Sequence, residues 1–143
     1  MKARLLLTLG LLLTAASCGG DGVIDAVVAP PPGIAPTLTA LQSAIFTPRC
    51  AVRGGFCHVS PQPAQGMDLS AGNTFISTVG VDSVELSDFK RVSPGNAADS
   101  YLYMKVAGDP RIVPVQMPMV GDLLSASELD AVRAWIDAGA KDN

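Results

Sequence analysis

The sequence predicts an all-α domain of roughly 100 residues that follows an exported leader. Several segments repeat apolar residues at helical spacing, each between a capping residue and a Gly or Pro. No segment alternates strongly between apolar and polar residues, as a half-buried strand would. Aromatic residues make up only 5% of the chain. A domain this small therefore gains from a disulfide or a bound cofactor that adds to its core.

The leader covers residues 1–17. Lys2 and Arg4 precede a short apolar run, Leu5–Leu13, and three small residues end the segment. The run is shorter than the roughly 20 residues that a spanning helix needs, so it is typical of a secretory signal peptide. Cys18 follows at once, an order that resembles a bacterial lipoprotein signal, in which this cysteine is lipidated. The alternative is an ordinary signal peptidase site that leaves Cys18 as a free thiol.

Residues 18–36 are rich in Gly and Pro and predict a flexible tether, because prolines favour extended polyproline II geometry. The formal net charge falls from −3 to −5 when Lys2 and Arg4 leave with the signal peptide. An acidic chain argues against nucleic acid and against anionic lipid surfaces as partners. Acyl chains on Cys18 are therefore the membrane attachment that we expect.

The domain itself covers residues 37–143 and begins with two predicted helices. Thr37–Phe46 carries apolar residues near one face, Thr37 or Thr39 can cap it, and Pro48 is expected to end it. A shorter helix is predicted over Ala71–Val79, where a glycine closes the segment. The cysteine-containing loop is thus expected to start where the first helix stops.

Two more helices follow. Ala97–Ala107 has Asn96 as its expected cap and Gly108 as its expected stop. In SASELDAVRAWIDAGA, Ser125 and Glu128 have the spacing of a capping box, and an apolar stripe precedes a terminating glycine. The Pro-rich segment between these helices predicts irregular structure.

The stretch CAVRGGFCH, Cys50 to His58, contains two of the three cysteines and the only histidine. A covalently bound haem needs two thiols for its vinyl groups and an imidazole for its iron, and the compact attachment site has two residues between the cysteines. Here six residues separate them, although Gly54-Gly55 can turn the chain sharply. The same loop can close as a Cys50–Cys57 disulfide. A zinc site would need a fourth ligand, which the chain does not offer.

Five stretches occur in a characteristic order: IFTPRC, CHVS, GMDLSAGNTF, RVSPGNAADSYLYMKVAG and QMPMVGDLLSASELDAVRAWIDAGA. Together they resemble the small cytochrome c-like domains of exported bacterial lipoproteins, including those of the planctomycete type. The resemblance extends from Ile45 to Asp142. The chain departs from these domains in the spacing of its two cysteines.

The resemblance implies a set of haem-binding residues. Cys50 and Cys57 would form the thioethers, and His58 would be the proximal iron ligand, with its other ring nitrogen held by a backbone carbonyl. Met117 would be the distal ligand, with Met119 as the second choice. The remaining methionines and aromatic residues are expected to pack the core or the cavity wall: Met67, Met104, Tyr101, Tyr103 and Trp135, the last of these near Phe46.

These observations predict an electron-transfer protein, not an enzyme, with one haem c under His/Met ligation. It would be lipid-anchored in the bacterial cell envelope, in the periplasm or at the cell surface, with other redox proteins as partners. The alternative is a haem-free binding or structural lipoprotein with a Cys50–Cys57 disulfide, which the wide cysteine spacing favours. A haem-based sensor is a third possibility that the sequence does not separate from the first.

Overall fold

A computed structural model describes residues 33–52 and 57–143. The predicted leader, Cys18, most of the tether and the Arg53–Phe56 segment lie outside the described residues. The described part is helix-rich, and its strand pairing is limited to three isolated bridges, which agrees with the predicted all-α class. None of its helices is both long enough and apolar enough to cross a bilayer.

The first helix starts as α1 (Leu38–Leu41) and continues as η1, a π-helix over Gln42–Cys50. The side chain of Thr37 caps it by accepting a hydrogen bond from Ala40 N at 3.3 Å. The predicted end at Pro48 is wrong. Within an α-helix a proline ring clashes with the carbonyl four residues earlier, but here the chain winds in wider i→i+5 turns and runs on. Cys50 is therefore the last residue of a helix and does not lie in a loop.

The middle of the chain contains short helices joined by irregular segments. They are η2 (Ala64–Gly66), α2 (Thr74–Thr78), η3 (Ala97–Asp99) and α3 (Tyr101–Ala107).

The helix predicted over Ala97–Ala107 is broken at Ser100, whose backbone is extended. The backbone N–H groups of Tyr101 and Leu102 bond to the carbonyls of Lys90 and Arg91, so the segment at 90–91 takes the first donors of α3. The predicted cap by the Asn96 side chain is confirmed. The predicted stop is also confirmed, because Gly108 has a φ of 76° that favours glycine.

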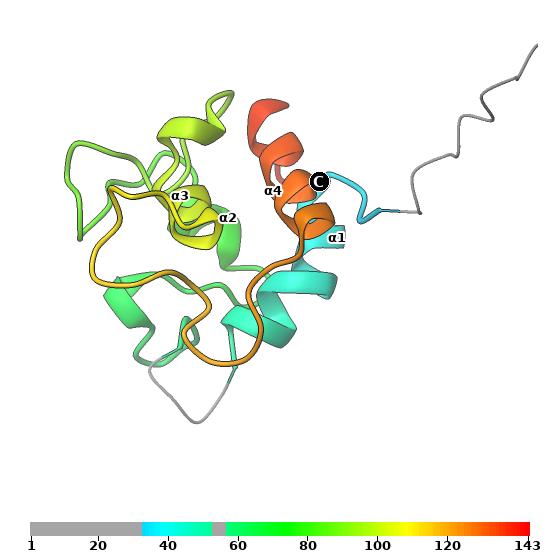
Figure 1. The fold of residues 1–143 in the computed structure, drawn as a ribbon. Coiled ribbons are helices and arrows are strands. Elements are labelled where there is room, and N and C mark those ends of the chain that lie inside the picture. Colours follow the sequence, from blue (N-terminus) through cyan, green and yellow to red (C-terminus); the bar gives the residue numbers. More distant parts are fainter. Residues whose placement is uncertain (1–32, 53–56) are drawn as a thin grey trace, which may run out of the picture.

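α4 (Ala126–Asp137) has the predicted capping box between Ser125 and Glu128. Its buried side chains are Ala131, Val132, Trp135 and Ile136, and they face α1 and α3. α4 lies between α1 and α3 and contacts both of them (Figure 1).

The end of the described chain returns to its beginning. The side-chain oxygen of Asn143 accepts from Leu38 N at 3.0 Å, and its backbone oxygen accepts from Thr39 N at 2.8 Å. Trp135 Nε1 donates to the carbonyl of Lys141 at 2.8 Å and holds the C-terminal tail against α4. Asn143 thus satisfies donors at the start of α1 that have no partner inside the helix.

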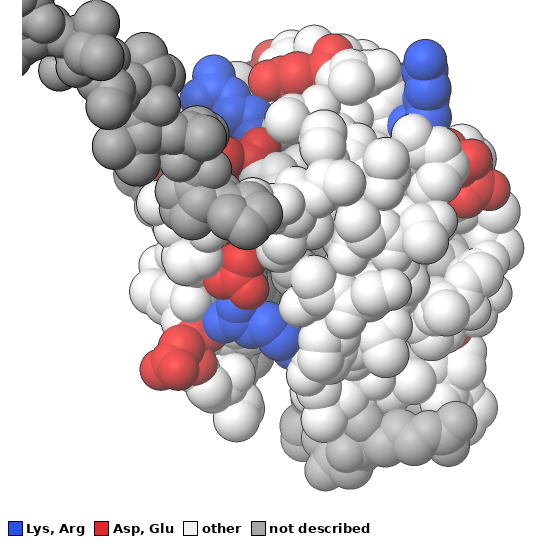
Figure 2. All heavy atoms as spheres, turned by 90° about the vertical axis from the view of Figure 1, so that its right-hand side faces the viewer, with Lys and Arg blue, Asp and Glu red and all other residues white. Residues whose placement is uncertain are grey.

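Figure 2 shows the face to which α1 and α4 contribute. Uncharged residues cover most of it, and the charged side chains lie in small groups of both signs. The described part of this face therefore shows no continuous basic patch of the kind that binds nucleic acid.

Candidate functional site

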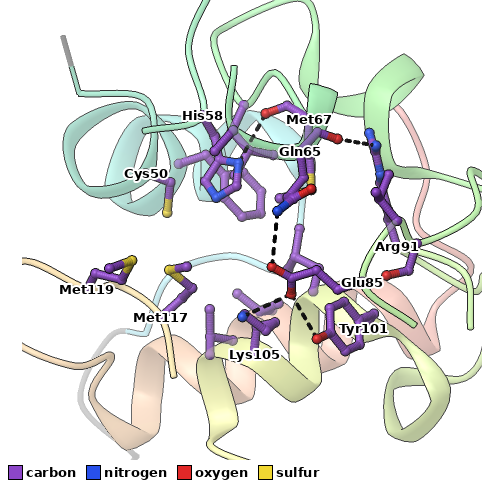
Figure 3. Close-up of a pocket in the computed structure, with 18 of the residues that line it drawn as sticks. Cys50, His58, Gln65, Met67, Glu85, Arg91, Tyr101, Lys105, Met117 and Met119 are labelled. Atoms are coloured by element: carbon purple, nitrogen blue, oxygen red, sulfur yellow. Dashed lines mark hydrogen bonds and ion pairs between the residues drawn. The ribbon is translucent and has the colours of Figure 1, made fainter. Parts of the chain in front are cut away.

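A largely apolar cavity of about 270 Å³ lies inside the domain (Figure 3). Its walls come from η1, α3 and α4, and from irregular segments around residues 58–69, 83–91 and 114–124. The apolar wall includes Ile45, Phe46, Leu69, Leu102, Val106 and Val132. Three helices and three connecting segments thus converge on one interior space.

Four of the predicted site residues line this cavity: Cys50, His58, Met117 and Met119. In Figure 3, Cys50 and His58 lie on one side of the space, and the two methionines lie on the other. Cys57 is not among the lining residues, although it directly precedes His58. The structure therefore brings together one of the two predicted thioether anchors and both candidate axial side chains.

The imidazole of His58 is oriented by a backbone group. Its Nδ1 lies 3.2 Å from the carbonyl oxygen of Met67, and the resemblance implied a backbone carbonyl at this nitrogen without saying which. A carbonyl can only accept, so Nδ1 carries the proton of the neutral ring and Nε2 keeps its lone pair. Burial lowers the pKa of His58 below its ordinary value, against smaller opposing effects from backbone hydrogen bonds. The ring is thus held neutral, the state in which an imidazole binds a metal.

The backbone around His58 is fixed as well. Its N–H donates to the carbonyl of Cys50 at 3.0 Å, and its carbonyl accepts from Leu69 N at 2.8 Å. The first bond closes the loop between the two cysteines at its base. Both thiols are free and half-buried in the structure.

Asp68 stabilises the segment that holds His58 in place. Its carboxylate accepts hydrogen bonds from the hydroxyl groups of Ser60 and Ser70, from Ser70 N, and from Asn73 Nδ2. Burial favours a higher pKa for this carboxyl, but these hydrogen bonds outweigh burial and lower its pKa. Because Asp68 lies between Met67 and Leu69, the network holds two of the three residues that fix His58.

The two methionines differ in how they are held. Met117 is half-buried, its N–H donates to the carbonyl of Lys105 at 2.9 Å, and Gln116 Nε2 donates to the carbonyl of Val106 at 2.9 Å. The C-terminal end of α3 therefore fixes Met117. Met119 is 68% exposed. The order in which the sequence ranked the two residues, Met117 before Met119, matches their burial.

The environment of Cys50 makes its thiol unreactive. Burial raises its pKa to about 11, and the nearby guanidinium of Arg49 opposes this rise only in part. The group is therefore protonated at neutral pH, and a protonated thiol is a poor nucleophile.

The far end of the cavity carries a polar network that the sequence did not reveal. Lys105 Nζ lies 3.1 Å from Glu85 Oε2, and the Tyr101 hydroxyl donates to the same oxygen at 2.9 Å. Arg91, also nearly buried, donates to three backbone carbonyls, those of Gln65, Gly66 and Ser77. The one available signal was Lys105, which interrupts the apolar pattern YLYMKVA.

The other residues expected to pack do so in different places. Met104 and Trp135 are buried in the core, Tyr101 and Met67 line the cavity, and Tyr103 is half-buried beside the core.

An imidazole nitrogen and a thioether sulfur that face one apolar space can provide one nitrogen and one sulfur ligand to a metal held between them. The described residues contain no group of three or more His, Cys, Asp or Glu side chains that could hold a metal ion by themselves. No family model matches the chain, and comparisons with curated proteins and with solved structures gave no significant match.

Proposed function

We propose that this protein is an electron carrier with one covalently attached haem c, which His58 and Met117 ligate axially. One observation carries the proposal. Both side chains line the same apolar cavity from opposite sides, and the thiol of Cys50 lies at its wall (Figure 3).

The residues fit a haem by their chemistry. Imidazole and thioether are a known axial pair for haem iron, and a mostly apolar lining suits the macrocycle. The volume of about 270 Å³ is slightly below the range of about 300–1,000 Å³ typical of cofactor pockets, so the cavity must widen to hold the group. We expect the cavity to widen at Met119, because this side chain lines the cavity and yet is largely exposed. Cys57 must also turn toward the cavity for a second thioether to form.

The roles of the protein groups follow from their environments. A bound haem would supply the one-electron couple between Fe(III) and Fe(II). The Met67 carbonyl orients His58 so that its neutral Nε2 would hold the iron, and Met117 would bring an uncharged sulfur, a ligand that favours reduced iron. The mostly apolar wall would cover much of the macrocycle.

We further propose that the protein is not an enzyme and that it works at the cell envelope. The sole histidine has a ligand role, and no nucleophile–base pair is evident in the sequence. Lipid on Cys18 would anchor the domain through the tether, and other envelope redox proteins would exchange electrons with it.

Co-expression of the full chain with a haem-attachment system tests the proposal. We expect a Soret band that survives acid–acetone extraction, and a protein mass raised by one haem. A Cys50→Ala variant should lose one thioether, and Cys57→Ala the other, as seen in the reduced α-band. Met117→Ala should remove the weak ferric band at about 695 nm, on the usual assignment to Met–iron ligation, whereas Met119→Ala should keep it.

The second candidate is a haem-free lipoprotein with a Cys50–Cys57 disulfide. The hydrogen bond between His58 N and Cys50 O favours it, because this bond brings the two ends of the loop together. A colourless protein with no free thiol at Cys50 and Cys57 would establish this candidate and refute the electron carrier.

A further inference from the structure

We propose that Arg49 is a positioning residue that joins residues 116–124, here called the methionine segment, to helix η1, which ends at Cys50. By this contact Arg49 keeps Met117 rather than Met119 facing His58. The anchoring of the segment stands on contacts in the structure, and only the choice of iron ligand rests on the proposed function.

Arg49 lies in the last turn of η1, directly before Cys50. Its guanidinium reaches two carbonyl groups of the segment that leads into α4 and one carboxylate in the first turn of α4. It pairs with Glu128 Oε1 at 2.5 Å, and it donates to the carbonyl oxygens of Asp122 and Leu123, the latter at 3.1 Å. One side chain therefore joins the end of the first helix to the start of the last.

Glu128 adds rigidity to this connection. Its second carboxylate oxygen accepts from Ser125 N at 2.7 Å and closes the capping box of α4. These hydrogen bonds outweigh burial, which alone would raise the pKa of Glu128, and the net effect is a lowered pKa. The carboxylate that holds Arg49 is thus itself fixed to a helix start. Both side chains of the pair are largely shielded from water, with 23% and 19% exposed, so the pair is screened less than a surface ion pair.

The methionine segment is then attached at two places. On one side, Met117 N and the Gln116 side chain bond to α3. On the other side, Arg49 holds the carbonyls at 122 and 123, directly before Leu124, whose side chain is buried at the cavity wall. Met119 and Val120 lie between these attachments and point largely to solvent.

Loss of the second attachment leaves the segment held by α3 alone, so the segment moves more. Met117 and Met119 are two residues apart, so a slip of two residues, which also breaks the bond of Met117 N to the Lys105 carbonyl, exchanges the thioether that faces His58. Only arginine supplies a planar fork that serves a carboxylate and neighbouring carbonyls together, so lysine would restore part of the attachment at most.

The test uses the full chain with Arg49→Gln, and Arg133→Gln as the matched control. Arg133 makes an exposed ion pair with Asp137 at 3.5 Å on α4, far less shielded than that of Arg49. Limited oxidation with dilute hydrogen peroxide, followed by mass spectrometry of each methionine, works with or without haem. We expect Met117 to be oxidised several-fold faster in Arg49→Gln than in the wild type, and at the wild-type rate in Arg133→Gln. Equal Met117 rates in all three proteins would overturn the inference.

Met104, which is 1% exposed, reports whether the variant is folded. If Arg49→Gln also exposes Met104, Arg49→Lys decides: a rise at Met117 with Met104 protected supports the inference, and no rise at Met117 refutes it.

In haem-loaded protein, the band at about 695 nm gives a second readout. We expect Arg49→Gln to weaken this band, and Met119→Ala to abolish the remainder in the Arg49→Gln background but not in the wild type. If Arg49→Gln leaves the band unchanged, and Met119→Ala has no effect on it in either background, the proposal that Arg49 selects Met117 as the iron ligand is overturned. A protein without haem would refute the electron carrier alone, since the oxidation experiment still tests the anchoring by Arg49.

Discussion

The rings of Phe46 and Trp135 meet edge to face, with centroids 6.4 Å apart and an interplanar angle of 67°. Both side chains are almost fully buried, and they join the first helix to the last. Phe46 also lines the cavity, so the same ring belongs to the core and to the wall of the site. The expectation that Trp135 packs near Phe46 is confirmed.

This contact predicts the cost of a substitution. Phe46→Leu should lower the free energy of unfolding by about 1–2 kcal/mol, because it removes the aromatic pair and leaves a small void. Urea denaturation followed by the fluorescence of Trp135, the sole tryptophan, measures this cost. A variant as stable as the wild type would show that the pair adds nothing beyond apolar burial.

The raised pKa of Cys50 predicts slow alkylation in reduced, haem-free protein. With a pKa of about 11, its thiolate fraction at pH 8 is more than 100-fold below that of an ordinary cysteine, whose pKa is about 8.5. Iodoacetamide labelling, located by mass spectrometry, should therefore be slow at pH 8 and accelerate about tenfold per pH unit up to pH 10. The same chain in urea is the control, and equal rates in both states would contradict the prediction.

Asp68→Asn should destabilise the fold by about 2 kcal/mol at pH 7, because an amide cannot accept all the hydrogen bonds that the carboxylate receives. The folded-state pKa lies below the unfolded value of about 3.9, so the contribution of Asp68 is present above that value. It is lost as the pH falls through the folded-state pKa. The difference between wild type and variant should thus be constant from pH 5 to 8 and shrink toward pH 2. Urea denaturation across this range measures it, with the exposed Asp88→Asn as control.

The ion pair between Lys105 and Glu85 predicts non-additive effects. Lys105→Met should cost about 2–4 kcal/mol, since it leaves a largely buried carboxylate without its cation. The double variant with Glu85→Gln should cost less than the sum of the two single changes, by about 1–2 kcal/mol. Additive costs in a double-mutant cycle, measured by chemical denaturation, would show that the two charges do not interact.

Local signals predicted the caps and stops of the helices. The side chains of Thr37, Asn96 and Ser125 cap where their hydrogen-bonding groups indicate, and Gly108 follows α3 with the positive φ that glycine allows. These features depend on residues within one turn of each other, so spacing alone identifies them.

Two kinds of feature were not predicted: an unusual helix type, and contacts between residues far apart in the sequence. Pro48 does not stop the first helix, because the wider π-helical turns accommodate it. Ser100 interrupts a helix because the segment at 90–91 takes the backbone donors that follow it. Nothing in the sequence singled out Arg49, Glu85 and Arg91, and only the folded chain shows that each has partners far away along it. The convergence of Cys50, His58 and Met117 on one cavity likewise comes from tertiary packing.

The contacts of Asn143 with the start of α1 close the described domain into a non-covalent ring. The linear order of its elements is then one of several that the same packing allows. A circular permutant that joins residue 143 to residue 33 through a short linker, and opens the chain at the exposed Ser87–Asp88 bond, would keep the cavity and every residue that lines it. Such a protein could be attached to an electrode or a membrane from a different side without altering its interior.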